Sequence, residues 1–183
     1  IRAISSGEFN DEITPYRIEE HQADLNAREV KTKTREVSQD EGPRADTSVE
    51  ALAKLKPVFA QKGSVTAGNS SQMSDGAAAV LLCSETALKC YNLTPIGKFL
   101  GFSVAGVPPE IMGIGPKEAI PRVLKQVGLS LGDMGWIELN EAFAAQSLAV
   151  IQDVGLDPAI VNPLGGAIAL GHPLGATGAI RTA

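Results

Sequence analysis

Cysteine, histidine and aromatic residues are scarce in this chain. Two cysteines, two histidines and one tryptophan occur among 183 residues, and aromatic side chains make up 4%. Cys83 and Cys90 have six residues between them, a spacing that matches neither a zinc site nor a redox CxxC motif. We therefore predict no metal site, and we expect Cys83, at the end of an apolar run, to be a buried free thiol in a reducing compartment.

Long apolar runs and excess positive charge are also missing. No stretch approaches the length of a membrane-spanning helix, and the 183 residues show no signal peptide or anchor. The net charge is −5, with a pI near 5.1. This balance argues against nucleic acid or an anionic membrane as the main partner, because both favour a basic face. The remaining composition is typical of a globular protein.

The apolar pattern predicts strands and helices along the chain, and they alternate regularly only after residue 73. Expected strands cover residues 9–18, 30–37, 76–83, 95–107 and 136–139, with 76–83 fully buried. Expected helices follow a capping box at 47–50 and an N-cap at Ser84, and cover residues 116–127 and 141–154. Gly128 is the expected end of the third helix. Such alternation predicts an α/β layered fold with a mixed sheet.

Residues 162–178 form the most informative segment, with five glycines, two prolines and His172 in seventeen residues. Glycine allows backbone shapes that side chains forbid and lets a ligand approach the main chain. A histidine fixed between such turns is a candidate for proton transfer or for donation to an oxyanion. A histidine that only pins a turn is the structural alternative.

Polar residues at other junctions have similar alternatives. Asn140 follows a short expected strand, so it is either the N-cap of the next helix or an amide that binds a water or a substrate oxygen. Glu141 would then occupy the first helical position, beside the helix dipole. Ser71 belongs either to a turn or to a polar ligand surface. Arg44 would bind phosphate or stack on a base, or it is simply solvated.

Three motifs together resemble the thiolases, the acetyl-CoA C-acyltransferases and acetyltransferases. Residues 140–144 match the family's NEAFA motif, and residues 165–178 match GGxxAxGHPxGxSG with Thr177 in place of the commoner serine. Residues 67–71 and 74–78 match the family's CoA-contacting loop. The likeness runs from about Phe9 to the last residue, with the motifs in the family's order.

The resemblance implies a partial thiolase fold, layered α/β/α/β/α and built from two similar halves with a loop domain inserted in the first. By this likeness, residues 1–73 are the later part of the loop domain. Residues 74–94 end the N-terminal half, and residues 95–183 begin the C-terminal half. The chain is thus expected to be incomplete at both ends.

The resemblance also implies the chemistry, thiolytic cleavage of a 3-ketoacyl-CoA by CoA in fatty acid β-oxidation. His172 would accept the thiol proton and donate to the thioester oxygen, and Asn140 would bind the water that completes this oxyanion hole. Coenzyme A is a substrate here, and no cofactor is implied. The side chains implied to line the pantetheine tunnel or to meet the adenine are Ala67, Ser71, Met73, Phe143 and Arg44. A homodimer or homotetramer is implied, cytoplasmic in a bacterium and mitochondrial or peroxisomal in a eukaryote.

The reactive thiols are where this sequence departs from the family. The family's nucleophilic cysteine would precede Ile1 and its second catalytic cysteine would follow Ala183, and neither Cys83 nor Cys90 lies in such a motif. We therefore expect the 183 residues alone to be inactive. Other interpretations are a biosynthetic acetyl-CoA acetyltransferase, a ketoacyl synthase, a non-catalytic acyl-CoA binder, and an incomplete fold of low stability.

Overall fold

A computed structural model describes residues 1–183, which divide into two compact units, Ile1–Ala45 and Asp46–Ala183. The first unit contains α1 (Arg2–Ser5), β1 (Tyr16–Asp24) and β2 (Glu29–Val37). The elements of the second unit, in chain order, are α2 (Val49–Leu52), α3 (Glu85–Tyr91), the 3₁₀ helix η1 (Pro109–Ile114), α4 (Gly115–Val127), η2 (Leu131–Asp133), α5 (Ala144–Val154), α6 (Ala167–Leu170) and α7 (Thr177–Thr182). None of the helices is long and apolar enough to cross a membrane.

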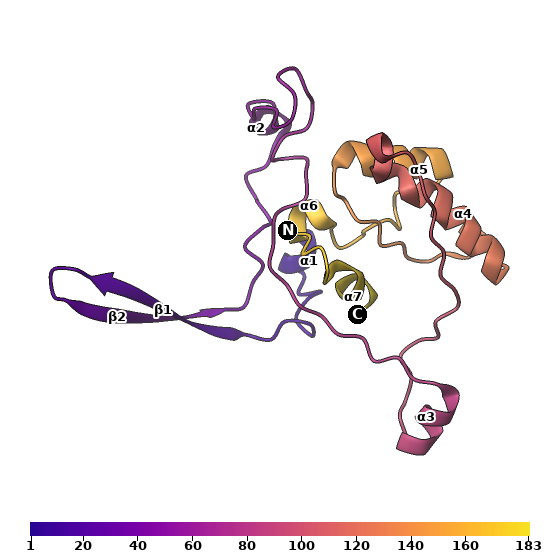
Figure 1. Ribbon diagram of the computed structural model, residues 1–183, viewed down its shortest axis with the longest axis horizontal. Coiled ribbons are helices and arrows are strands. Elements are labelled where there is room, and N and C mark those ends of the chain that lie inside the picture. Colours follow the sequence, from indigo (N-terminus) through magenta and orange to yellow (C-terminus); the bar gives the residue numbers. More distant parts are fainter. The chain divides into compact units, whose positions relative to one another are not determined.

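Strands β1 and β2 form an antiparallel hairpin, visible as a long ribbon in Figure 1, with Tyr16 opposite Val37 and Asp24 opposite Glu29. The second strand confirms the expected 30–37 strand. The first begins at Tyr16, so the expected strand over residues 9–18 is wrong for most of its length. Residues 9–12 instead form turns, with the Glu12 and Ile13 N–H groups both donating to the carbonyl of Phe9.

Helices α4 and α5 lie side by side (Figure 1), and both contribute to a small apolar core. Leu139, Val150 and Leu156 are its buried centre, and Val150 is fully inaccessible. The partly buried side chains that pack on them are Ile120, Leu131, Ile137, Ile151, Val154 and Val161. Helix α4 ends as expected, because Gly128 has φ +70, a left-handed conformation that glycine adopts without strain.

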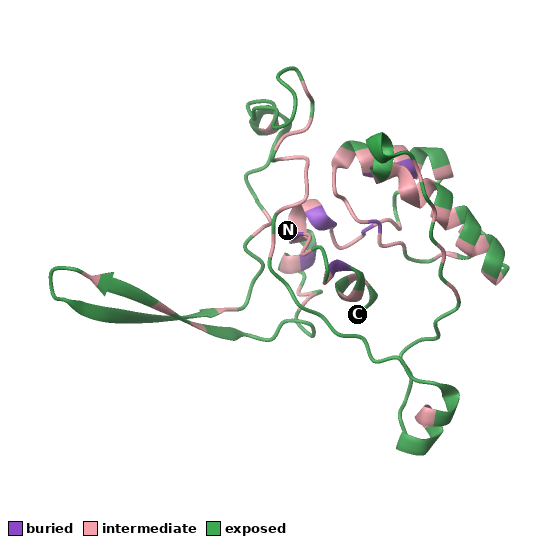
Figure 2. Ribbon diagram, viewed as in Figure 1, coloured by how far each residue is buried: buried purple, intermediate pink, exposed green.

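Residues 76–83 and 95–107 do not form the expected strands. These residues have no strand partner, and Leu81 and Leu82 are about four-fifths exposed. A β-strand is stabilised by its neighbours, and none of residues 1–183 provides one at these segments. Figure 2 shows the resulting exposed stretch of chain on both sides of α3.

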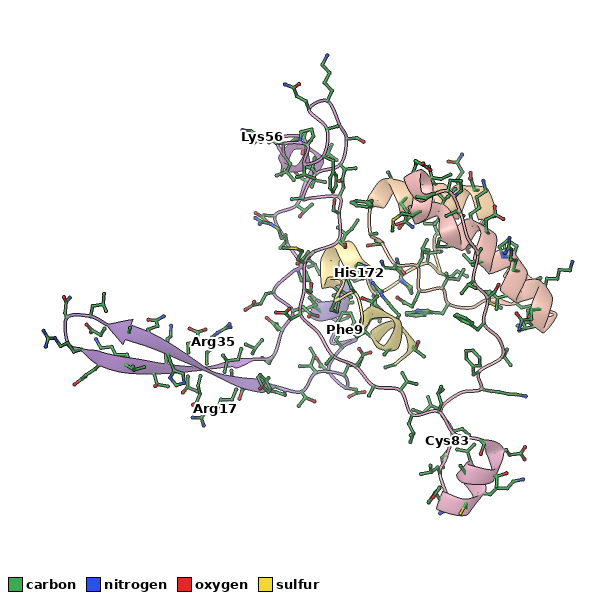
Figure 3. The ribbon with its side chains drawn as sticks, in the orientation of Figure 1. Phe9, Arg17, Arg35, Lys56, Cys83 and His172 are labelled. Carbon is green, nitrogen blue, oxygen red and sulfur yellow. The ribbon has the colours of Figure 1, made fainter.

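The expected burial of Cys83 is also wrong. Cys83 and Cys90 are free and exposed, and Figure 3 shows Cys83 at the start of α3. The buried environment predicted for Cys83 depended on the strand that does not form. By contrast, Ser84 caps α3 as expected, because its hydroxyl accepts the Ala87 N–H at 3.1 Å. Ser48, inside the expected capping box, caps α2 in the same way.

Candidate active site

Residues 69–71 and residues 142–144 are far apart in the sequence but pair through backbone hydrogen bonds. Ser70 forms an isolated antiparallel bridge with Phe143. The Ser71 N–H donates to the Ala142 carbonyl at 3.0 Å, and the Ala144 N–H donates to the Asn69 carbonyl at 2.9 Å. This short ladder fixes the 69–71 loop against the NEAFA segment, residues 140–144.

Gln72 connects the same loop to the histidine turn. Its side-chain amide donates to the Ile168 and Ala169 carbonyls at 2.9 and 3.1 Å, and these are among the last carbonyls of α6. The His172 N–H donates to the Gln72 carbonyl at 3.2 Å. Sequence reasoning missed Gln72, because a glutamine in a polar loop carries no signal of a partner almost a hundred residues away.

The His172 ring is contacted at both nitrogens. Nδ1 lies 2.8 Å from Oγ1 of Thr177, the buried first residue of α7, and Nε2 lies 3.3 Å from Nδ2 of Asn140. The Asn140 amide nitrogen can only donate, so Nε2 accepts and the ring proton is on Nδ1, which donates to Thr177. The arrangement therefore fits the neutral tautomer that carries its lone pair on Nε2.

Asn140 is not the helix N-cap that its sequence position suggested. Helix α5 begins at Ala144, and Phe143 occupies the capping position without a side-chain hydrogen bond. The Oδ1 atom of Asn140 is buried and has no hydrogen-bond partner within the chain. Because buried acceptors are almost always satisfied, this oxygen indicates a donor from a water or a ligand.

Asn162 positions the strand end that precedes Asn140. Its side chain accepts the Leu139 N–H at 2.8 Å and donates to the Leu139 carbonyl at 2.7 Å, as a neighbouring strand would. Its φ of +46 is left-handed, a conformation that asparagine tolerates better than most residues. Around it, Ile137 pairs with Val161 in a parallel bridge, so the expected strand over 136–139 is reduced to a single bridge.

Glycine brings the 72–76 segment close to the histidine. Gly171 has φ +94, and a Cβ there would lie 2.0 Å from the Ser74 hydroxyl oxygen. An open cavity of about 460 Å³ lies beside this contact, lined by residues 74–78 and 173–176. The glycines of the histidine turn thus serve close backbone packing.

The other predicted binding residues fall into three groups. Ser71 and Phe143 are half-buried beside Asn140, and the Phe143 ring packs edge-on against Phe59 with centroids 5.9 Å apart. Ala67 and Met73 flank this loop and are exposed, Met73 completely. Arg44 belongs to the first compact unit, whereas the other predicted site residues all belong to the second.

Comparison with known proteins shows which family the chain belongs to. Residues 1–86 match the family model of the thiolase N-terminal domain, and residues 93–183 match that of the thiolase C-terminal domain. The chain is 51% identical over 177 residues to a 3-ketoacyl-CoA thiolase of Bacillus subtilis, covering 97% of this chain and 45% of the relative. It is 52% identical over 178 residues to an acetyl-CoA acetyltransferase of Pseudomonas aeruginosa, covering 97% and 43%. The chain therefore spans less than half the length of these curated relatives.

Solved structures give the same result for the fold. The Bacillus anthracis acetyl-CoA acetyltransferase superposes with a TM-score of 0.88 at 48% identity, over 99% of this chain and 43% of that one. Human mitochondrial 3-ketoacyl-CoA thiolase in complex with CoA gives 0.81 at 46% identity, over 99% and 42%. The dimeric peroxisomal thiolase of Saccharomyces cerevisiae gives 0.85 at 44% identity, over 99% and 43%. The chain has part of the thiolase fold, and it belongs to the thiolase family.

Proposed function

We propose that the full-length protein carrying these residues is an acyltransferase that cleaves 3-ketoacyl-CoA with CoA, releasing acetyl-CoA and a shortened acyl-CoA. The observation that carries the proposal is the Asn140–His172 pair, with Nδ2 and Nε2 3.3 Å apart at the junction of the two motifs. Two further observations support it, the 3-ketoacyl-CoA thiolase name of a close relative and the CoA bound in a related structure.

His172 supplies the base in this reaction. Its neutral ring, with the proton on Nδ1 and the Thr177 hydroxyl as acceptor, keeps the lone pair on Nε2, where it accepts from Asn140 Nδ2 until the thiol takes that place. Nε2 takes the proton of the attacking thiol, and the thiolate attacks the 3-keto carbon of the substrate. The bond between C2 and C3 then breaks, so the acyl group stays on sulfur and acetyl-CoA leaves as an enolate that takes up one proton. Once protonated, Nε2–H donates to the oxygen on which negative charge develops. Proton acceptance and oxyanion stabilisation then come from one atom.

Asn140 supplies the second donor through a water. A water that donates one hydrogen to the buried Asn140 Oδ1 keeps its other hydrogen for the substrate oxygen. This accounts for an acceptor that otherwise has no partner in the chain. Each such donor contributes on the order of 3–4 kcal/mol to lowering the barrier.

The CoA substrate would approach along the 67–73 loop and Phe143. Ala67, Ser71 and Met73 are exposed or half-buried, so a ligand can reach them. The NEAFA segment fixes the loop that carries them, which suits the wall of a pantetheine tunnel. We assign Arg44 to the adenine end of CoA on the resemblance alone. The reaction in this proposal uses no cofactor and no metal.

Acetoacetyl-CoA thiolysis tests the proposal directly. The full-length protein should consume the thioester only when CoA is present, and His172→Ala should abolish most of this activity. Because neither Cys83 nor Cys90 lies in a catalytic motif, the 183-residue chain alone should show no thiolysis above a buffer control. An inactive full-length protein that binds CoA in a calorimeter would instead establish a non-catalytic acyl-CoA binder.

A biosynthetic acetyl-CoA acetyltransferase is the second candidate, favoured by the names of the Pseudomonas aeruginosa relative and the Bacillus anthracis structure. Both reactions use the same histidine and asparagine, so acyl length separates them. A degradative enzyme should accept a long-chain 3-ketoacyl-CoA with kcat/KM comparable to that for acetoacetyl-CoA. Strong preference for acetoacetyl-CoA would favour the biosynthetic enzyme.

The domain division and assembly complete the proposal. Residues 1–73 would be the later part of the loop domain, 74–94 the end of the N-terminal half, and 95–183 the start of the C-terminal half. We expect a homodimer or homotetramer, supported by the dimeric state named for the yeast relative. Location would be cytoplasmic in a bacterium and mitochondrial or peroxisomal in a eukaryote. Light scattering and fractionation test these two points.

A further inference from the structure

Glu141 makes contacts that its place beside Asn140 does not explain. Sequence reasoning assigned it to the first helical position of α5, which is wrong because that helix begins at Ala144. Its carboxylate turns instead toward the histidine segment. Oε1 accepts from Asn162 Nδ2 at 3.1 Å, and Oε2 accepts from the Ile168 N–H at 3.2 Å. A carboxylate satisfies both donors because it accepts at both oxygens.

The space for this carboxylate exists because residue 166 is glycine. Gly166 is buried, and a Cβ there would lie 2.0 to 2.2 Å from the three atoms of the Glu141 carboxylate. Its φ of −107 and ψ of −166 are extended backbone that an alanine would adopt without strain. The missing side chain at Gly166 therefore serves the carboxylate and not a special backbone shape.

These contacts connect the two halves of the catalytic pair. Glu141 follows Asn140 directly, and Ile168 lies in α6, which leads through Gly171 to His172. The carboxylate binds the beginning of that segment, while the Gln72 side chain binds the Ile168 and Ala169 carbonyls near its end. Releasing the carboxylate would leave α6 and His172 free to shift relative to Asn140.

We propose that Glu141 is a positioning residue that sets the Asn140–His172 separation, because its carboxylate occupies the space left by Gly166 and holds α6 through the Ile168 N–H. The expected effect on kcat rests on the proposed acyl transfer, whereas the expected effect on the position of His172 does not. A shift of the pair by a fraction of an ångström lowers the rate of the chemical step and leaves CoA binding almost unchanged, because the carboxylate hydrogen bonds are to Asn162 and Ile168, outside the proposed CoA-binding residues.

Two variants remove the same contact from opposite sides. Glu141→Gln keeps the size but presents an NH₂ group to one of the two donors. Gly166→Ala keeps Glu141 and displaces its carboxylate. Glu110→Gln and Gly115→Ala are the matched controls, since Glu110 is exposed and a Cβ at Gly115 meets nothing within 4 Å. Full-length protein is used throughout, with folding checked by circular dichroism.

The ¹⁵N shifts of the His172 ring are the first readout. Both variants should change the Nε2 shift, while His21 in the hairpin and both controls should not change. The second readout is kinetic, with kcat lowered about 10-fold, corresponding to one lost hydrogen bond, and KM within about 2-fold.

Amide exchange of Ile168 in the unaltered protein needs no variant and should be slow. Unchanged His172 shifts in folded variants, or free exchange at Ile168, would overturn the proposal. If instead the His172 shifts change in a protein that has no thiolysis activity, only the proposed function fails.

Discussion

Nδ1 of His172 lies 2.8 Å from Oγ1 of Thr177, so the histidine turn and the first residue of α7 are joined side chain to side chain. Thr177 is buried, with 7% of its surface exposed. The hydroxyl is the acceptor that keeps the ring proton on Nδ1 and so leaves Nε2 unprotonated. A threonine at a position where the family more often has serine therefore preserves the required group.

The first prediction concerns this hydroxyl. Thr177→Val keeps the shape but removes the acceptor, so the neutral ring loses its preference for the Nδ1 tautomer. We expect kcat to fall about 10-fold, the equivalent of one neutral hydrogen bond, with little change in KM. Thr177→Ser should stay within about 2-fold of the parent protein. Steady-state thiolysis kinetics measures both, and equal losses in the two variants would argue against a role for the hydroxyl.

The second prediction uses the two histidines as a matched pair. His172→Ala in the full-length protein should lower turnover by about 100-fold or more, because it removes the proton acceptor and one oxyanion donor. His21→Ala, in the exposed hairpin where Nδ1 lies 3.0 Å from Thr32 Oγ1, should leave turnover unchanged. Near-parental activity of the His172 variant would refute its catalytic role.

Short-range signals in the sequence predicted two helix ends correctly. Gly128 ends α4 and Ser84 caps α3, because capping depends on the residue itself and its immediate neighbours. The motifs carrying His172 and Asn140 were also recognisable, since several unusual residue types recur at fixed spacing. Each of these features is encoded within a few consecutive residues.

Long-range contacts were not predictable in the same way. Glu141 binding to Ile168 and Gln72 binding to α6 span 27 and 96 residues. Nothing in a single sequence indicates which loop a polar side chain will meet. The apolar runs at 76–83 and 95–107 misled for a related reason, because apolar character favours a buried strand only where neighbouring strands are present.

The third prediction concerns Gly171 and the stability of the site. Gly171→Ala places a Cβ 2.0 Å from the Ser74 hydroxyl and forces a non-glycine residue to φ +94. We expect this variant to lose about 1–3 kcal/mol of unfolding free energy from backbone strain alone. Gly175→Ala is the control, since its Cβ would meet nothing within 4 Å. Urea denaturation of both variants measures the difference, and equal midpoints would contradict the close packing of the 72–76 segment.

The fourth prediction concerns pH and two aspartates. The Ser130 hydroxyl at 2.7 Å and the Ser130 N–H at 2.8 Å hold the pKa of Asp133 below its ordinary value of 3.8. Because the folded-state pKa is the lower one, the capping box stabilises the fold fully above the unfolded pKa, and this contribution is lost as pH falls through the folded one. The pKa of Asp24 is also below its ordinary value, chiefly because its carboxylate accepts a hydrogen bond from Lys31.

Side-chain substitutions should separate the two effects. Ser130→Ala should raise the pKa of Asp133 part of the way to 3.8, since the backbone donor remains, and should leave Asp24 unchanged. Lys31→Met should raise the pKa of Asp24 alone. Carboxyl ¹³C titrations of the two variants measure both groups in one experiment. If Ser130→Ala moved both aspartates together, the change would reflect global loosening of the fold, and the local capping box would not be its cause.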